Sequence, residues 1–177
     1  MRIQFDSSIL ANLVRDIEDF PKPGVTFKDI TPLLANPEAF SSAVDAIVVS
    51  FGRGQIDKVV GIEARGFIIA APVAYHFNAG FVPLRKAGKL PYDTLSQSYD
   101  LEYGSETLEL HSDAISSDDR VLIVDDVLAT GGTAAAACEL VERTGATVSG
   151  LAFIIELSFL EGAKRISDYN YTSLLTY

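Results

Sequence analysis

The 177-residue sequence contains one cysteine, one methionine and no tryptophan, and it is short of positive charge. The single cysteine, Cys138, excludes an intrachain disulfide and a cysteine metal cluster, which favours a reducing compartment. Lys and Arg number 14 against 24 Asp and Glu, and the net charge of −10 opposes binding to a nucleic-acid backbone or an anionic membrane. A polyanionic substrate would therefore require local cations and backbone amides.

Long apolar runs and a targeting segment are also lacking. No run approaches the ~20 residues that span a bilayer, because Glu63 and Arg65 interrupt the longest candidate. The first residues contain no basic region followed by an apolar stretch, so we expect no secretory signal, no membrane partner and a cytoplasmic location. Hydrophobic residues make up 48% of the chain and no linker or repeat divides it, so we predict a single domain over residues 1–177.

Apolar periodicity predicts alternating helices and strands. Helical spacing follows Ser7 and continues through Ile17 to a stop at Pro21, and Asn36 precedes a second helical stripe that ends near Phe51. Strands are predicted at 58–62, 81–84, 120–124 and 146–155, helices at 66–77 and 132–144, a long loop or mobile hairpin at 85–104, and an edge strand in 169–177. Repeats of strand, helix and strand indicate an α/β fold with a mostly parallel central sheet flanked by helices.

Two acids, Asp125 and Asp126, stand at the carboxyl end of the clearest buried strand, before a small-residue turn that opens a helix. The turn consists of Ala129, Thr130, Gly131, Gly132 and Thr133. Its glycines let the backbone approach a phosphate, its threonines offer hydroxyls, and the helix N-terminus adds amides and a favourable dipole. We therefore predict a monophosphate site, with the two acids on the ribose, where they accept hydrogen bonds from its hydroxyls or hold a divalent metal through water. The alternative is that these residues only end a strand and cap a helix.

The stretch from Asp125 to Thr133 resembles the phosphoribosyl pyrophosphate signature of type I phosphoribosyltransferases, and the likeness covers nearly the whole chain. The resemblance implies the fold of that family, with a base-binding hood and a flexible catalytic loop. Residues 19–32 look like the base-binding segment of adenine phosphoribosyltransferases, whose backbone reads the adenine edge while an aromatic ring stacks on it. These roles would fall to Thr26, Phe27 and Lys28, although many members carry arginine in place of Lys28. The alternative is a proline-rich turn that covers a core edge.

The segment from Glu63 to Gly66 resembles the pyrophosphate loop of the same family, and Arg65 would face the leaving group. The family often has a hydroxyl residue where Ala64 stands, so one side-chain hydrogen bond is in doubt. Three further cations would stabilise charge on pyrophosphate. These are Arg85, Lys86 and Lys89. A surface ion pair between Glu63 and Arg65 and a solvated basic loop are the alternatives.

The resemblance also implies the remaining roles. Glu102 would act as the general base that takes the proton at N7 of the purine, and Tyr103 would pack or hydrogen-bond near the substrate. Leu157 would form the other wall of the base site, with ordinary core packing as its alternative. Mg²⁺ would be held mainly by the oxygens of phosphoribosyl pyrophosphate, so no dedicated protein metal ligands are predicted. The reaction implied is transfer of phosphoribose to adenine, which gives AMP and pyrophosphate in purine salvage, by a homodimer.

Three other functions are compatible with parts of the sequence. An enzyme of the same class could use another base, although the segment from Val25 to Ile30 argues against it. A non-catalytic sensor of phosphoribosyl pyrophosphate would require a nucleic-acid-binding surface, and no helix-turn-helix module or broad basic face is apparent. A phosphate-receiving signalling domain could use acids around Mg²⁺, but the Thr-Gly-Gly-Thr turn would then have no purpose.

Overall fold

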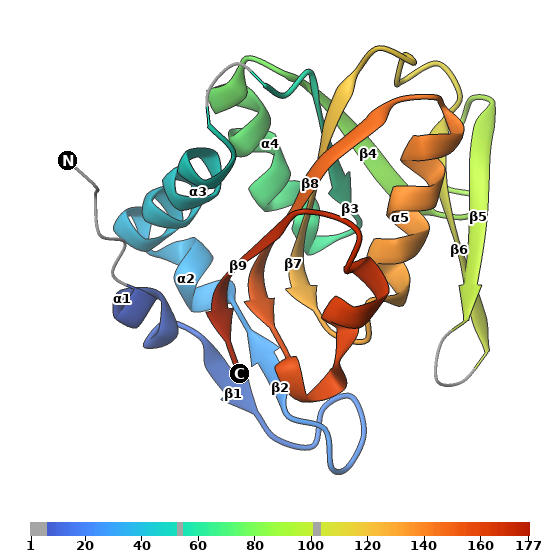
Figure 1. The fold of residues 1–177 in the computed structure, drawn as a ribbon. Helices are drawn as coiled ribbons and strands as arrows, with labels where there is room; N and C mark the ends of the chain where they lie inside the picture. The colour runs from blue at the N-terminus through green and yellow to red at the C-terminus, as the bar shows by residue number, and fades with distance from the viewer. Residues whose placement is uncertain (1–6, 53–54, 101–103) are drawn as a thin grey trace. The chain divides into compact units, whose positions relative to one another are not determined.

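The computed structural model describes residues 7–52, 55–100 and 104–177 (Figure 1). Their internal contacts divide the chain into two compact units, one ending at Ala46 and one beginning at Ile47, and each unit is described by itself. A single domain over the whole chain stays a prediction. In the part of the chain that the structure describes, no helix combines the length and the apolarity that crossing a membrane requires.

The first unit contains short elements that the periodicity predicts only in part. They are α1 (Ser7–Ala11), β1 (Arg15–Ile17), β2 (Phe27–Asp29), α2 (Thr31–Ala35) and most of α3 (Pro37–Phe51). The predicted first helix is wrong beyond Ala11, because Arg15 and Ile17 pair with Asp29 and Phe27 in an antiparallel ladder instead.

The predicted helix after Asn36 is confirmed as α3. The Asn36 Oδ1 accepts hydrogen bonds from the backbone amides of Glu38 at 3.1 Å and Ala39 at 3.0 Å. These contacts satisfy two of the amides that a helix N-terminus leaves without an intrahelical partner. The local sequence therefore determines where this helix begins.

The second unit is built on a seven-stranded sheet in the order β5-β6-β4-β3-β7-β8-β9. Its strands are β3 (Lys58–Ile62), β4 (Gly80–Lys86), β5 (Thr94–Asp100), β6 (Ser105–His111), β7 (Arg120–Leu128), β8 (Thr147–Glu156) and β9 (Tyr171–Thr176). Five of these strands are parallel to one another: β4, β3, β7, β8 and β9. The other two, β5 and β6, add an antiparallel hairpin at one edge. The predicted α/β fold with a mostly parallel sheet is confirmed, as is the edge strand near the C-terminus.

Two predictions differ from this sheet in extent. The region 85–104, predicted as a long loop or mobile hairpin, includes the end of β4, which continues to Lys86, and β5, which pairs with β6 as a hairpin. The strand predicted at 120–124 continues to Leu128, because β8 pairs with it up to Glu156. Asp125 and Asp126 are therefore within β7 rather than after it.

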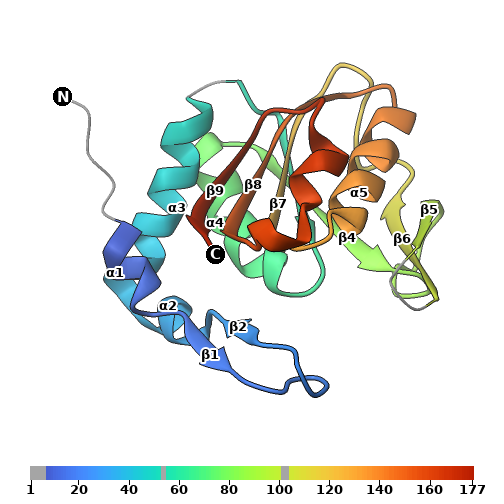
Figure 2. The same cartoon turned by 60° about the horizontal axis from the view of Figure 1, so that its bottom comes forward.

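Two helices connect the parallel strands in opposite directions. α4 (Arg65–Phe77) leads from β3 to β4, and α5 (Gly132–Arg143) leads from β7 to β8. Since such crossovers are right-handed, the helices cover opposite faces of the sheet (Figure 2). The core on the α5 face is closed by the short helix η2 (Gly162–Ile166), which follows η1 (Ser158–Leu160). The point where the connections diverge is between β3 and β7, and in open α/β sheets ligands bind outside the carboxyl ends of the strands there.

Candidate active site

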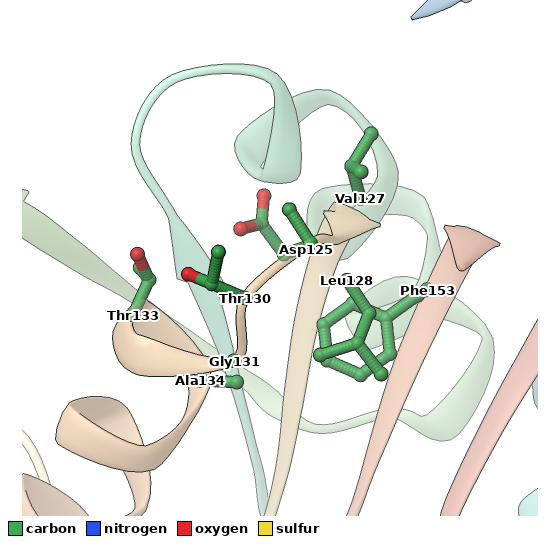
Figure 3. A pocket seen from close by; sticks show the side chains of 9 residues that line it. Asp125, Val127, Leu128, Thr130, Gly131, Thr133, Ala134 and Phe153 are labelled. Carbon is green, nitrogen blue, oxygen red and sulfur yellow. The ribbon is translucent and has the colours of Figure 1, made fainter. Parts of the chain in front are cut away.

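A pocket lies at the carboxyl end of β7, and the predicted phosphate turn forms part of its wall (Figure 3). Its lining residues are Asp125, Val127, Leu128, Ala129, Thr130, Gly131, Thr133, Ala134 and Phe153. The structure therefore brings Asp125 together with most of the predicted turn. Val127 was missed by the sequence interpretation, although strand alternation would have placed it on the same face as Asp125.

The phosphate turn, residues 129–133, ends in the first turn of α5. Gly131 is the N-cap residue with φ 79°, a left-handed conformation that glycine adopts without steric cost, and its cap has no side-chain hydrogen bond. The first amides of a helix have no intrahelical acceptor, and the helix dipole adds positive potential at this end. Gly132 is buried and Thr130 is exposed, so the open side of the turn carries a hydroxyl. Such an arrangement suits a small anion.

Arg65, which follows β3, contacts one of the two acids on the neighbouring strand β7. Arg65 Nε lies 2.6 Å from Asp126 Oδ2, but the N–H does not point at that oxygen, so the contact is an ion pair rather than a hydrogen bond. Burial and the neighbouring charge of Asp126 raise the pKa of Asp125 well above its usual range. Burial also raises the pKa of Asp126, and Arg65 opposes that shift. Asp126 is therefore engaged within the protein, while Asp125 faces the pocket.

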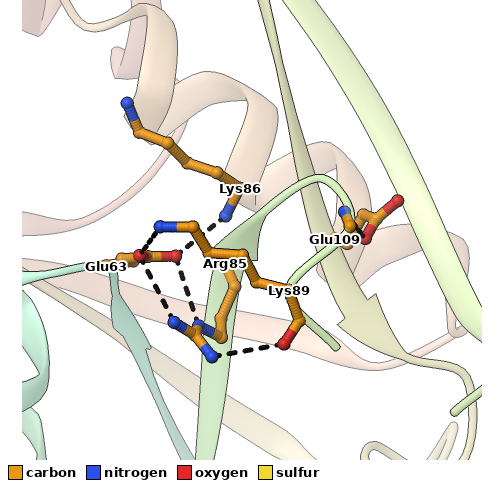
Figure 4. Close-up of polar contacts among 6 residues, drawn as sticks. Glu63, Arg85, Lys86, Lys89 and Glu109 are labelled. Atoms are coloured by element: carbon orange, nitrogen blue, oxygen red, sulfur yellow. Dashed lines mark hydrogen bonds and ion pairs between the residues drawn. The ribbon is translucent and has the colours of Figure 1, made fainter. Parts of the chain in front are cut away.

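Glu63 accepts hydrogen bonds from three of the predicted pyrophosphate-binding residues (Figure 4). Arg85 Nε donates to Glu63 Oε2 at 3.2 Å, Lys89 Nζ donates to Oε1 at 2.5 Å, and the Lys86 amide donates to Oε2 at 3.1 Å. Burial alone would raise the pKa of Glu63, but these hydrogen bonds outweigh it and lower the pKa to about 2. The alternative to a pyrophosphate loop is a surface ion pair between Glu63 and Arg65. In the structure Glu63 pairs with Arg85 and Lys89, and Arg65 pairs with Asp126. Instead Glu63 holds the cations of β4 and the turn after it.

The hairpin is connected to the phosphate turn through Tyr99 and Glu106, to which the sequence interpretation gave no role. Thr133 Oγ1 donates to the Tyr99 hydroxyl at 3.1 Å, and that hydroxyl donates to Glu106 Oε2 at 3.0 Å. Lys86 forms an ion pair with Glu106, which lowers the pKa of Glu106. Both Tyr99 and Glu106 lie on strands whose apolar pattern is weak. Only the pairing of β5 with β6, at Tyr99 opposite Glu106, brings them together.

The predicted base-binding residues of the first unit lie on or beside β2. Thr26 is exposed, and the Phe27 ring contacts Phe20 edge to face with 5.2 Å between the ring centroids. Lys28 Nζ donates to Asp16 Oδ1 at 2.7 Å across the β1-β2 pair. That contact gives the Lys28 side chain a structural partner in its own unit.

Of four other predicted residues, two belong to the second unit and two lie outside the described residues. The half-buried Leu157 donates its amide to the carbonyl of Leu128, a pocket residue, at 2.9 Å. Ala64 is exposed at the N-cap of α4, and it gives that cap no side-chain hydrogen bond. Glu102 and Tyr103 lie outside the described residues.

Replacing Glu63 with glutamine is expected to lower the melting temperature at pH 7 by at least about 2–4 °C, the shift that 1 kcal/mol gives in a domain of this size. The pKa of Glu63 is about 2 in the folded protein against an ordinary 4.5. The ionised carboxylate therefore stabilises the fold above pH 4.5, and this contribution is lost as pH falls toward 2. Calorimetric melts of both proteins between pH 7 and pH 3 measure the difference.

The control for that experiment is Glu161→Gln, which removes a carboxylate from an exposed ion pair with Lys164. Exposed pairs contribute little, so this variant should melt close to the unmodified protein throughout. A stability difference for Glu63→Gln that stays constant from pH 7 to pH 3 would contradict the proposed ionisation.

The comparisons with known proteins agree with one another. Residues 23–175 match the family described as "Phosphoribosyl transferase domain". The adenine phosphoribosyltransferase of Acidothermus cellulolyticus is 61% identical over 94% of this chain and 94% of its own length. The crystal structure of the enzyme of that name from Rhodothermus marinus is 52% identical, with a TM-score of 0.93 over 97% of this chain and 98% of that one. The Saccharomyces cerevisiae structure, a complex with adenine and an imino-altritol bisphosphate, is 39% identical, with a TM-score of 0.91 over 96% and 98%.

Proposed function

This chain belongs to the adenine phosphoribosyltransferases of the phosphoribosyl transferase domain family, and on that basis we propose how its residues divide the reaction. The reaction transfers the 5-phosphoribosyl group of phosphoribosyl pyrophosphate to adenine and gives AMP and pyrophosphate, a step of purine salvage. The single observation that carries the proposal is the position of the phosphate turn beside Asp125, at the point where the sheet connections diverge.

The phosphate turn binds the 5′-phosphate through its backbone amides and the hydroxyls of Thr130 and Thr133. Asp125 accepts hydrogen bonds from the ribose hydroxyls, which its place in the pocket lining supports. Asp126 lies next to it in β7 and is paired with Arg65, and resemblance to the family assigns it to the same ribose site. The amides and hydroxyls of the turn thus bind the phosphate, and carboxylates a few residues earlier bind the ribose hydroxyls.

The leaving pyrophosphate is bound by the cations that follow β3 and β4. Arg65 stabilises its developing charge, Ala64 contributes backbone groups of the same loop, and three cations of β4 and the turn after it assist. These are Arg85, Lys86 and Lys89. Their carboxylate partners, Glu63 and Glu106, keep them extended and in place before the substrate arrives. Charge placed in advance costs no reorganisation during the reaction.

Other residues bind the adenine base and accept its proton. Thr26, Phe27 and Lys28 read and stack on adenine, Leu157 forms a second wall, and the aromatic stacking supplies about 1–3 kcal/mol. Glu102 accepts the N7 proton as N9 attacks the sugar carbon, and Tyr103 packs near the substrate. Resemblance to the family supports these roles, and the Leu157 contact with Leu128 supports a position near the pocket.

Mg²⁺ fits this site as an ion carried by the substrate. Among the described residues, no group of three or more His, Cys, Asp or Glu could hold a metal by itself. Asp125, a carboxylate that lines the pocket, would reach the ion through water, and phosphoribosyl pyrophosphate would supply the other oxygens. When bound, the ion neutralises pyrophosphate charge.

A homodimer in the cytoplasm completes the proposal. Ile68 and Tyr75 of α4 are seven residues apart on one helix face and are 47% and 84% exposed, and Phe81 of β4 is 39% exposed. Exposed apolar side chains of this size support a protein contact at α4. The one cysteine is buried and unpaired, which fits a reducing compartment.

A competition between bases tests the function. The purified protein is incubated with Mg²⁺, phosphoribosyl pyrophosphate and equimolar adenine, hypoxanthine, guanine and xanthine, and the nucleotides formed are separated. We expect AMP alone, because backbone donors and acceptors distinguish an amino from an oxo purine. Another monophosphate would reassign the base, and no product despite tight binding of phosphoribosyl pyrophosphate would indicate a sensor.

A further inference from the structure

The phosphate turn lies directly against a residue to which no role has been assigned, Gly162 at the start of η2. A Cβ atom added to Gly162 would lie 2.1 Å from the carbonyl oxygen of Ala129 and 2.8 Å from the nitrogen of Gly131. A Cβ atom added to Gly131 would in turn lie 2.3 Å from the carbonyl oxygen of Gly162. Real Cβ atoms essentially never approach other atoms within 3.0 Å. At both Gly131 and Gly162 the opposite backbone therefore leaves space for a hydrogen atom on Cα but not for a side chain.

The segment that carries Gly162 is fixed on its far side as well. Ile166 is fully buried and Ala163 packs against the core under α5. η2 also contacts α5, the helix that the phosphate turn opens. Just before Gly162, Glu161 has φ 55°, so the chain turns sharply into the contact. The turn therefore rests on a support that the core holds in place.

We infer that Gly162 is a positioning residue for phosphoribosyl pyrophosphate. Its backbone sets the location of Ala129 and Gly131, and hence the direction of the amides that receive the 5′-phosphate. The inference rests on the proposed function and extends it to a residue 31 positions beyond Gly131 that need not touch substrate. Any side chain at 162 displaces the turn, because the atoms it would meet are backbone atoms.

The test is Gly162→Ala, with binding of ribose 5-phosphate and of inorganic pyrophosphate measured by calorimetry. We expect the Kd for ribose 5-phosphate and the KM for phosphoribosyl pyrophosphate to rise at least about tenfold, the effect of losing one hydrogen bond to a charged group. Pyrophosphate binding and the KM for adenine should change less than about threefold, because neither ligand uses the turn. An equal loss of affinity for the ribose phosphate, pyrophosphate and adenine would overturn the inference, since a general loss of structure would weaken the binding of all of them.

The matched control is Gly150→Ala in β8. A Cβ atom there would lie 2.4 Å from Phe51 Cε1 and 2.8 Å from the Asn170 carbonyl oxygen, a clash of similar severity away from the carboxyl edge of the sheet. This variant should lose thermal stability but keep its affinity for ribose 5-phosphate. An unmodified protein that neither binds ribose 5-phosphate nor makes AMP would reject the proposed function itself. Normal binding by Gly162→Ala would reject only the role of Gly162.

A second measurement uses the unmodified protein and decides the matter if Gly162→Ala does not fold. Amide hydrogen exchange is followed with and without ribose 5-phosphate, in peptides covering 129–133 and 158–166. Because the two backbones are in contact, both peptides should exchange more slowly when the ligand binds. Protection of 129–133 alone would overturn the inference.

Discussion

Replacing Arg65 with glutamine is expected to lower kcat for AMP formation by about 10²–10³-fold, the cost of removing one preorganised charge-stabilising group. Negative charge develops on pyrophosphate as its bond to ribose breaks, and Arg65 begins the helix after β3, at the carboxyl edge of the sheet where we propose that the substrate binds. Its contact with Asp126 orients the guanidinium before the substrate arrives. The measurement is steady-state kinetics with saturating adenine and phosphoribosyl pyrophosphate.

The same substitution also affects stability, and a double variant separates the two effects. Glutamine leaves Asp126, whose side chain is 7% exposed, without its cation. The cost is smaller than the ~3–5 kcal/mol of a fully buried pair, because one third of the Arg65 side chain is exposed. Adding Asp126→Asn removes the unpaired charge, so the double variant should regain melting temperature. Because Asp126 itself belongs to the proposed ribose site, kcat is compared with that of Asp126→Asn alone and should stay about 10²–10³-fold lower. Recovery of both would mean that Arg65 acts only through the fold.

Arg120→Gln provides the matched control for chemistry. Arg120 is an arginine at the amino end of β7, and its Nε donates to Asp57 Oδ2 at 2.8 Å. Its ion pair is exposed and lies at the opposite end of the strand from the phosphate turn. Loss of this pair should leave kcat unchanged. A similar fall in kcat for both variants would contradict the specific role of Arg65.

Some of these residues could be predicted from the sequence because their chemistry is local. The acids and the turn from Ala129 to Thr133 are contiguous, and they occupy one edge of the sheet whatever packs around them. The helix after Asn36 could also be predicted, because its cap and its apolar stripe are encoded within one stretch. Strong periodicity and a continuous motif were sufficient in both cases.

The rest depends on residues far apart in the sequence. Apolar spacing up to Ile17 fits a helix equally well, and only pairing with Phe27 makes it a strand. The β5-β6 hairpin has few apolar residues, so its sequence fits a loop as well as a pair of strands. The pairing of β6 with β4 makes it part of the sheet. Glu63 meets Arg85 and Lys89 across 22 and 26 residues, and such contacts appear only after the sheet is assembled.

Replacing Glu102 with glutamine is the second change with a large expected effect, a fall in kcat of about 10²–10⁴-fold, the usual contribution of a general base. Glutamine has nearly the same shape but cannot take the N7 proton while N9 attacks the sugar. The KM for phosphoribosyl pyrophosphate should change little, because the phosphate turn and Asp125 are unaltered. Steady-state kinetics with each substrate varied in turn measures both quantities.

The two strands that flank Glu102 in the sequence are paired with each other, and one of them is bonded to α5. Asp100 and Ser105 are paired at the tip of the hairpin, and Arg143 Nη1 of α5 donates to the carbonyl of Ser96 at 2.6 Å. The hairpin is thus attached to α5, the helix that the proposed phosphate turn opens. Glu109→Gln, on the same hairpin, is the control and should retain kcat. A raised KM for adenine with unchanged kcat would make Glu102 a binding residue, and the proton would then need another acceptor.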